Sequence, residues 1–138
     1  MTLVLKIKEI TADIIENMNS EKYKEQYLDW LLESKDNYID NTDFKLAIIK
    51  NKNTPLNILL EFYQNYNYNY EILLYVLEYR ISKIKDLSIL KEFSLNEDNL
   101  IISSLIKNDN INDEIIKTIL KYNKKSWVEL LLDYKRIS

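Results

Sequence analysis

The sequence contains no cysteine, no histidine and no glycine, and it has one proline in 138 residues. Without cysteine there is no disulfide, thiolate nucleophile or iron–sulfur ligand. Without histidine the chain lacks the commonest general base and the commonest metal ligand. Without glycine it lacks the phosphate-binding loops that need close backbone approach. Carboxylates, lysines and tyrosines remain for catalysis, so we expect neither an enzyme nor a cofactor site.

Long apolar runs are also missing. No run approaches the roughly 20 residues that cross a bilayer, and Lys6 and Lys8 interrupt the apolar amino terminus, which is too short for a secretory signal. Hydrophobic residues make up 46% of the chain and charged residues 30%, which is typical of a soluble folded protein. The length suits one domain with its own core. We therefore expect a single cytoplasmic domain spanning residues 1–138.

The proline marks a joint between two helices, in the stretch Asn51-Lys52-Asn53-Thr54-Pro55. Proline fits the first turn of a helix, where its missing N–H has no intrahelical partner. Thr54 precedes it and is a suitable N-cap. The stretch predicts that one helix ends near Lys50 and that the next begins at Pro55.

Helical spacing of apolar residues and capping residues predict short helices along the rest of the chain. Residues 2–9 also fit a short strand, but a lone strand has no partner here, so a helix through Ile14, restarting at Thr11, is favoured. The predicted N-caps are Thr11, Ser20, Thr42, Asn69, Asp86 and Asn96. The predicted helices cover residues 3–14, 20–35, 42–50, 55–64, 70–81, 87–93, 96–107, 113–122 and 126–135.

The joint recurs 57 residues later. Asn51 and Asn53 align with Asn108 and Asn110, and the apolar residues after the first joint align with Ile115, Ile116 and Ile119. The repeating unit is about 26–31 residues of helix, joint and helix, and such units bury their apolar faces only by stacking. The sequence therefore predicts an all-α, single-domain α-solenoid of about eight short helices.

Residues 46–62 resemble the bacterial leucine-rich repeat variant, whose repeats carry an N-P-N-T-P joint between short helices. Four of the five joint positions agree, with Lys52 in place of a proline. The second joint keeps only Asn108 and Asn110, so its cap is expected to shift by one residue. The resemblance implies a helical solenoid that presents a surface to a partner.

The segment from residue 9 to residue 43 is acidic, with ten acids against three lysines. Glu21, Glu25, Asp29 and Glu33 follow each other at intervals of four and form one ridge of a helix. Like charges at this spacing cost a helix a few tenths of a kcal/mol per pair. We interpret the ridge, extended by Asp36 and Asp40, as a docking surface for a basic protein. A solvated helix face is the alternative.

The Asn-Tyr stretch over residues 65–70 is a second candidate surface. Tyrosine and asparagine supply large, adaptable contact area in binding loops, and Tyr66, Tyr68 and Tyr70 cannot all point inward from one loop. The alternative is a low-complexity linker, since sixteen asparagines and eleven tyrosines in a glycine-free chain also fit an AT-rich coding bias.

The carboxyl end is basic. Residues 117–138 carry a net charge of +4, and the preceding residues carry −7. A phosphate-binding patch is one reading, but lysines also suit helix C-termini, and the whole chain carries −3. We expect Trp30 and Trp127 to lie in the core. The paired carboxylates Glu97–Asp98 and Asp113–Glu114 are expected to be first-turn helix acids.

The sequence thus favours a non-catalytic protein-binding module, of the inhibitor or immunity type, that binds a basic toxin or nuclease. Its predicted contact residues are Glu21, Glu25, Asp29, Glu33, Asp36, Asp40, Tyr66, Tyr68 and Tyr70. The alternatives are a nucleic-acid-associated helical-repeat protein that uses the basic end, and a scaffold subunit of a larger complex.

Overall fold

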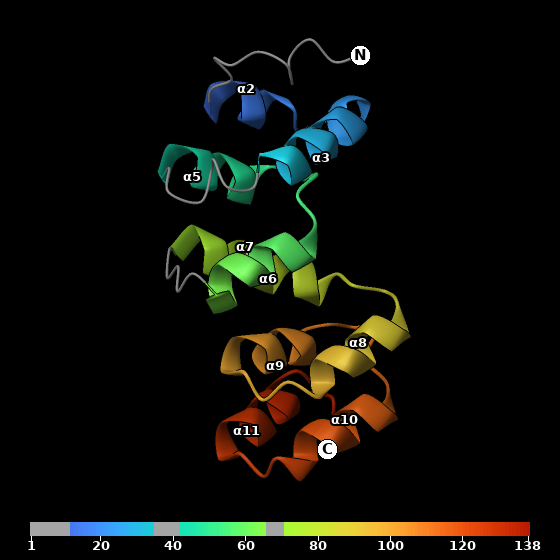
Figure 1. The fold of residues 1–138 in the computed structure, drawn as a ribbon. Coiled ribbons are helices and arrows are strands. Elements are labelled where there is room, and N and C mark those ends of the chain that lie inside the picture. Colours follow the sequence, from blue (N-terminus) through green and yellow to red (C-terminus); the bar gives the residue numbers. More distant parts are fainter. Residues whose placement is uncertain (1–11, 35–41, 66–70) are drawn as a thin grey trace. The chain divides into compact units, whose positions relative to one another are not determined.

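The computed structural model of the chain describes residues 12–34, 42–65 and 71–138, and every regular element in these ranges is a helix (Figure 1). The chain divides into two compact units, Met1–Leu73 and Leu74–Ser138, and the division falls within the sequence of α7. The expected all-α helical-repeat fold is confirmed; a single domain stays a prediction. The elements are α2 (Ala12–Asn17), η1 (Glu21–Tyr23), α3 (Lys24–Glu33), α5 (Thr42–Lys50), α6 (Leu56–Asn65), α7 (Glu71–Ser82), α8 (Leu87–Ser94), α9 (Asn99–Ile106), α10 (Asp113–Lys121) and α11 (Lys125–Asp133).

The C-terminal unit consists of stacked helical hairpins. Helix α8 packs against α9 and α10, and α11 packs against the same two helices. The hairpins α8–α9 and α10–α11 therefore stack with like helix on like helix, as Figure 1 shows. This is the arrangement expected of helical repeats. The buried apolar side chains of these helices include Leu90, Ile101, Ile102, Leu105, Ile106, Ile115, Ile119, Trp127 and Leu131.

The N-terminal unit packs α2 against α5. Helix α3 contacts α5 through Trp30, whose ring centroid lies 6.2 Å from that of Phe44 and 6.0 Å from that of Tyr27. Trp30 is 5% exposed, and Trp127 in the other unit is 2% exposed. Both tryptophans thus lie in the core, as predicted.

Asn51, directly after α5, closes the end of α2. The side chain is 1% exposed, and its Nδ2 donates to the carbonyl oxygens of Ile15 (2.7 Å) and Met18 (3.1 Å). Its Oδ1 accepts from the backbone N–H of Asn53 at 2.8 Å. The last carbonyls of a helix have no partner within the helix. An amide suits this site because it offers two N–H donors and an acceptor on one short side chain.

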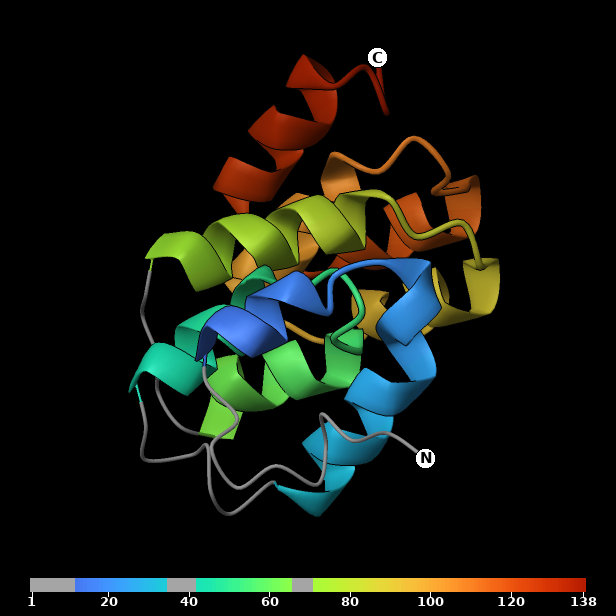
Figure 2. The ribbon, with the colours of Figure 1, turned by 90° about the horizontal axis from the view of Figure 1, so that it is seen from above.

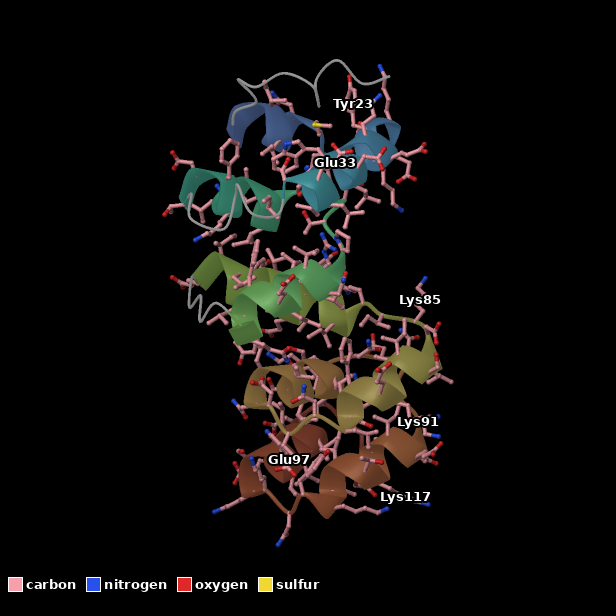
Figure 3. All side chains as sticks on the ribbon, viewed as in Figure 1. Tyr23, Glu33, Lys85, Lys91, Glu97 and Lys117 are labelled. Atoms are coloured by element: carbon pink, nitrogen blue, oxygen red, sulfur yellow. The ribbon has the colours of Figure 1, made fainter. Side chains whose placement is uncertain are left out.

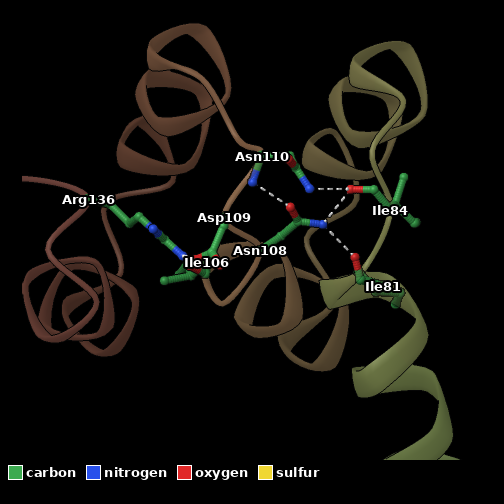
Figure 4. A network of polar contacts seen from close by, with 7 residues as sticks. All are labelled: Ile81, Ile84, Ile106, Asn108, Asp109, Asn110 and Arg136. Carbon is green, nitrogen blue, oxygen red and sulfur yellow. Dashed lines mark hydrogen bonds and ion pairs between the residues drawn. The ribbon is translucent and has the colours of Figure 1, made fainter.

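Asn108, after α9, makes the same contacts at the end of α7 (Figure 4). The fully buried Nδ2 donates to Ile81 O (2.8 Å) and Ile84 O (2.9 Å), and Oδ1 accepts from Asn110 N–H at 2.7 Å. Asn53 and Asn110 each add a side-chain donor to the same group of carbonyls. The repeat of 57 residues therefore repeats a contact in which one helix end caps another.

Arg136 takes the corresponding place after α11. Its Nε donates to Ile106 O at 2.9 Å, at the end of α9, and its Nη2 pairs with Asp109 at 2.9 Å (Figure 4). Arg136 belongs to the basic carboxyl end, and its guanidinium group is committed to a helix end and an ion pair. The group suits both contacts because it supplies several donors in a fixed plane.

The proline joint has the predicted position. Helix α6 begins at Leu56, and the carbonyl of Pro55 accepts the N–H of Leu59 at 3.4 Å. The Thr54 hydroxyl donates backwards to Ile48 O at 2.6 Å and lies 2.6 Å from the Tyr27 hydroxyl. Because the threonine proton goes to a carbonyl, the tyrosine is the donor in that second bond.

Two of the predicted caps are confirmed. Asp86 accepts from Ser88 N–H at 2.9 Å, and Asn112, at the shifted position, accepts from Ile115 N–H at 3.0 Å. Hydrogen bonds from Ser88 also lower the pKa of the Asp86 carboxyl below its usual value. The positions of Thr11 and Asn69 lie outside the described residues, and Thr42 is the first residue of α5.

Two other predicted caps are wrong. Asn96 does not cap α9; Asp98 does, accepting from Leu100 and Ile101 N–H, while Asn96 accepts from Asp98 N–H. The asparagine closes a turn because its side chain bonds two residues ahead. Ser20 makes no side-chain cap bond, and a 3₁₀ turn over Glu21–Tyr23 separates it from α3.

Helix α11, drawn in red near the C label in Figure 2, is followed by a residue with positive φ that is not glycine. Lys135 has φ 58° and Asn123, after α10, has φ 54°. Arg136 N–H donates to Leu131 O and Lys135 N–H to Leu132 O, which is the Schellman pattern. Asparagine tolerates this conformation better than lysine does, so Lys135 holds a strained backbone.

Replacing Asn108 with alanine is expected to destabilise the protein by about 3 kcal/mol, because three hydrogen bonds of a buried side chain disappear and the Asn110 N–H loses its acceptor. The measurement is urea unfolding followed by helical circular dichroism. The matched variant Asn110→Ala removes one exposed donor and should cost about 1 kcal/mol or less. Equal losses for the two variants would contradict the assigned role of Asn108.

Replacing Lys135 with glycine is expected to stabilise the protein by about 1 kcal/mol, because glycine adopts positive φ without steric cost. Thermal and urea unfolding measure the gain. The control Lys135→Ala removes the same charge and side chain but keeps the strain, so it should leave stability nearly unchanged. A gain of the same size in both variants would assign the effect to the lysine charge.

Candidate protein-binding surface

The acidic ridge, defined as Glu21, Glu25, Asp29 and Glu33, lies on η1 and α3, and all four side chains are exposed. The opposite face of α3 holds the buried Tyr27, Trp30 and Leu31, so the core contacts of these residues direct the carboxylates outward. Glu33 is labelled near the end of α3 in Figure 3. From Glu25 onward the ridge follows the regular helical spacing; Glu21 precedes it in the 3₁₀ turn.

An exposed leucine borders the ridge. Leu32 is 73% exposed and lies one turn from Asp29 and next to Glu33 in the sequence; Leu28, one turn before it, is half-buried. A single exposed leucine is ordinary. Leu32, however, shares the solvent-facing side of α3 with the carboxylates of Glu25, Asp29 and Glu33. The surface therefore combines an apolar contact with a negative border.

The other predicted contact residues are not described. Asp36, Asp40, Tyr66, Tyr68 and Tyr70 lie outside the described residues. Their part in a binding surface stays a prediction.

Exposed tyrosines do occur on α7, where the sequence reading did not place any. Tyr75 is 68% exposed and Tyr79 is 58% exposed. They face away from Leu73, Leu77 and Ile81, which are all fully buried. The only signal in the sequence is that the two tyrosines are four residues apart and opposite the leucines, and it is weak because both sides of the helix are apolar.

The basic residues of the C-terminal unit are interspersed with acids. Lys91 on α8 pairs with Glu114 on α10 at 2.8 Å, which lowers the pKa of the Glu114 carboxyl. Lys125 and Glu129 lie 3.9 Å apart on α11. Lys91 and Lys117 lie on neighbouring helices of this unit (Figure 3). With Arg136 committed to a helix end, the exposed lysines do not form a patch free of acids.

The carboxylates near the starts of α9 and α10, and the partly buried Tyr122, have structural roles. Asp113 and Glu114 lie in the first turn of α10, as predicted. Glu97 and Asp98 are not first-turn acids, because α9 begins at Asn99 and Asp98 is its N-cap. Burial raises the pKa of Tyr122, whose hydroxyl donates to Ser94 O at 2.6 Å. Within residues 12–34, 42–65 and 71–138, no three Asp or Glu side chains are placed to hold a metal ion.

No helix in the described part of the chain is long and apolar enough to cross a membrane. Comparison of the chain with models of protein families, with curated proteins and with solved structures gives no match. The resemblance of residues 46–62 to the leucine-rich repeat variant stays a prediction.

Proposed function

We propose that the chain is a non-catalytic protein-binding module that uses the acidic ridge to bind a basic protein partner. The observation that carries the proposal is the arrangement on α3, where exposed carboxylates border the exposed Leu32. Interfaces combine an apolar contact with a polar border, and charge complementarity directs encounter and selects partners.

The distribution of charge supports this assignment. Residues 1–73 contain eight lysines and twelve Asp or Glu, a net charge of −4, whereas residues 74–138 carry +1. The negative charge of the protein is therefore concentrated in the unit that bears the ridge. A row of like charges at i,i+4 spacing is unfavourable for the helix itself. Helix stability therefore does not explain the ridge, whereas a binding role does.

An inhibitor or immunity-type protein that covers a basic toxin or nuclease fits this surface best. Such a partner carries lysines and arginines to bind phosphates, and a ridge of carboxylates competes for the same groups. The chain itself has no histidine or cysteine for catalysis, so binding is the activity that its exposed groups support.

Reversing Asp29 and Glu33 to lysine tests the proposal. The partner is purified on the immobilised chain from source cells at low salt, and its affinity for the wild-type and double-variant proteins is then measured. We expect binding about tenfold weaker or worse, mainly through a slower association rate, because the reversed charges repel the partner. The difference should shrink at high salt.

The matched control reverses Glu92 and Asp133, which are exposed in the C-terminal unit, and so changes the net charge by the same amount. It should keep at least half of the wild-type affinity. The proposal is wrong if no protein partner is recovered, if the ridge variant binds normally, or if both double variants lose affinity equally.

A further inference from the structure

A shallow groove lies on the exposed side of α7 within the C-terminal unit. It encloses about 160 Å³ and is lined by Tyr75, Glu78, Tyr79 and Ser82, which we call the tyrosine groove. The four residues occupy positions i, i+3, i+4 and i+7 of one helix, so they share a face. The two rings are mostly exposed, and the groove is therefore open to a ligand.

The groups that line the groove accept hydrogen bonds or cations. The Ser82 hydroxyl donates its proton to Tyr79 O at 2.7 Å. The lone pairs of the Ser82 oxygen can therefore accept a hydrogen bond from a ligand. Glu78 is a carboxylate and accepts only. The faces of the Tyr75 and Tyr79 rings attract cations through their quadrupoles. Apart from the tyrosine hydroxyls, the side chains of the groove present no donor.

The chain's own ammonium groups already occupy two of these acceptors. Lys83 places its Nζ 5.6 Å from the centroid of the Tyr79 ring. Lys107, from α9, donates to the Glu78 carboxylate, and this hydrogen bond raises the pKa of Lys107. Both contacts identify the kind of group that the ring and the carboxylate bind: a nitrogen cation with N–H donors.

We propose that the tyrosine groove binds the guanidinium group of an arginine from the basic partner, stacked on a tyrosine ring and hydrogen-bonded to Glu78 Oε2, beside the Lys107 contact at Oε1. Arginine fits better than lysine because its planar group stacks on a ring while its edge donates to a carboxylate. The assignment rests on the proposed function for the source of the arginine, but its test does not need the partner.

The position of Lys83 predicts whether removing its charge strengthens or weakens ligand binding. An arginine that stacks on Tyr79 replaces the ammonium group of Lys83 and is repelled by its charge. Removing that charge should therefore tighten arginine binding. A groove that bound an acidic or phosphate-bearing ligand would respond in the opposite way, because Lys83 would then be an attracting group.

The test is a titration of the whole protein with acetyl-Gly-Arg-Gly-amide, followed by the aromatic NMR signals of Tyr75 and Tyr79. We expect saturable shifts of both ring signals. The matched ligand acetyl-Gly-citrulline-Gly-amide has the same shape without the charge and should give no saturable shift. Equal responses to the two peptides, or no saturation with the arginine peptide, would overturn the assignment.

Three variants complete the test. Tyr79→Leu should weaken binding of the arginine peptide by about two- to fivefold, and Tyr79→Phe should not, because only the ring is needed. Lys83→Gln should tighten it by about twofold or more; weaker binding would overturn the proposal. The control Tyr23→Leu removes another tyrosine under a lysine, with Lys22 Nζ 5.3 Å from its ring, but in the other unit, and should change nothing.

The outcomes separate the two proposals. If the peptide fails to bind while the ridge variant still loses the partner, the groove assignment is wrong and the protein-binding function stands. If the peptide binds as expected and the ridge variant binds the partner normally, the groove assignment stands and the ridge is not the docking surface.

Discussion

Capping of helix ends by side chains from a later helix is the interaction on which the rest of the fold depends. The carbonyls at the ends of α2, α7 and α9 receive donors from Asn51, Asn108 and Arg136, which lie between 24 and 36 residues away in sequence. In many helices a glycine ends the last turn, and this chain has no glycine. In these helices the last carbonyls instead accept hydrogen bonds from side chains that follow a neighbouring helix. The helix end is therefore completed only when the neighbouring helix stacks on it. This also accounts for part of the asparagine content that a coding bias alone would leave unexplained.

The sequence was sufficient to predict the helices because its signals are local. Pro55 and the apolar spacing placed α6, and Asp86 and Asn112 were recognised as caps from their position alone. The errors arose where two polar residues compete within one turn: Asn96 and Asp98 are both good caps, and which one caps depends on where the backbone turns. The role of Arg136 escaped prediction for a different reason. A basic residue near a basic terminus suggests a charged patch, and only the packing of α11 beside α9 brings its guanidinium group to Ile106 O.

The candidate surfaces were predicted in part. The acidic ridge followed from four-residue spacing, and its four carboxylates are exposed; a docking role for it stays a prediction. The exposure of the tyrosines on α7 was not predicted. The helix carries Leu73, Leu77 and Ile81 on one side and tyrosines on the other, so it is apolar all round and gives a weak periodic signal. Composition drew attention to the Asn-Tyr stretch instead. Exposure, and not residue type, distinguishes a tyrosine that packs from one that presents its ring, and exposure is a property of the fold.

The two proposed surfaces, the ridge and the tyrosine groove, would act on a cationic group over different distances. Exposed carboxylates influence a cationic partner over about 8–10 Å in physiological salt, so the role proposed for the ridge is chiefly in the rate of encounter. A ring face and a single carboxylate act only at contact, where they oppose departure. Differences in affinity between related complexes arise mostly from differences in the dissociation rate. The two proposals therefore predict different kinetic effects: changes to the ridge alter the association rate of a basic protein, and changes to the groove alter the dissociation rate of an arginine ligand.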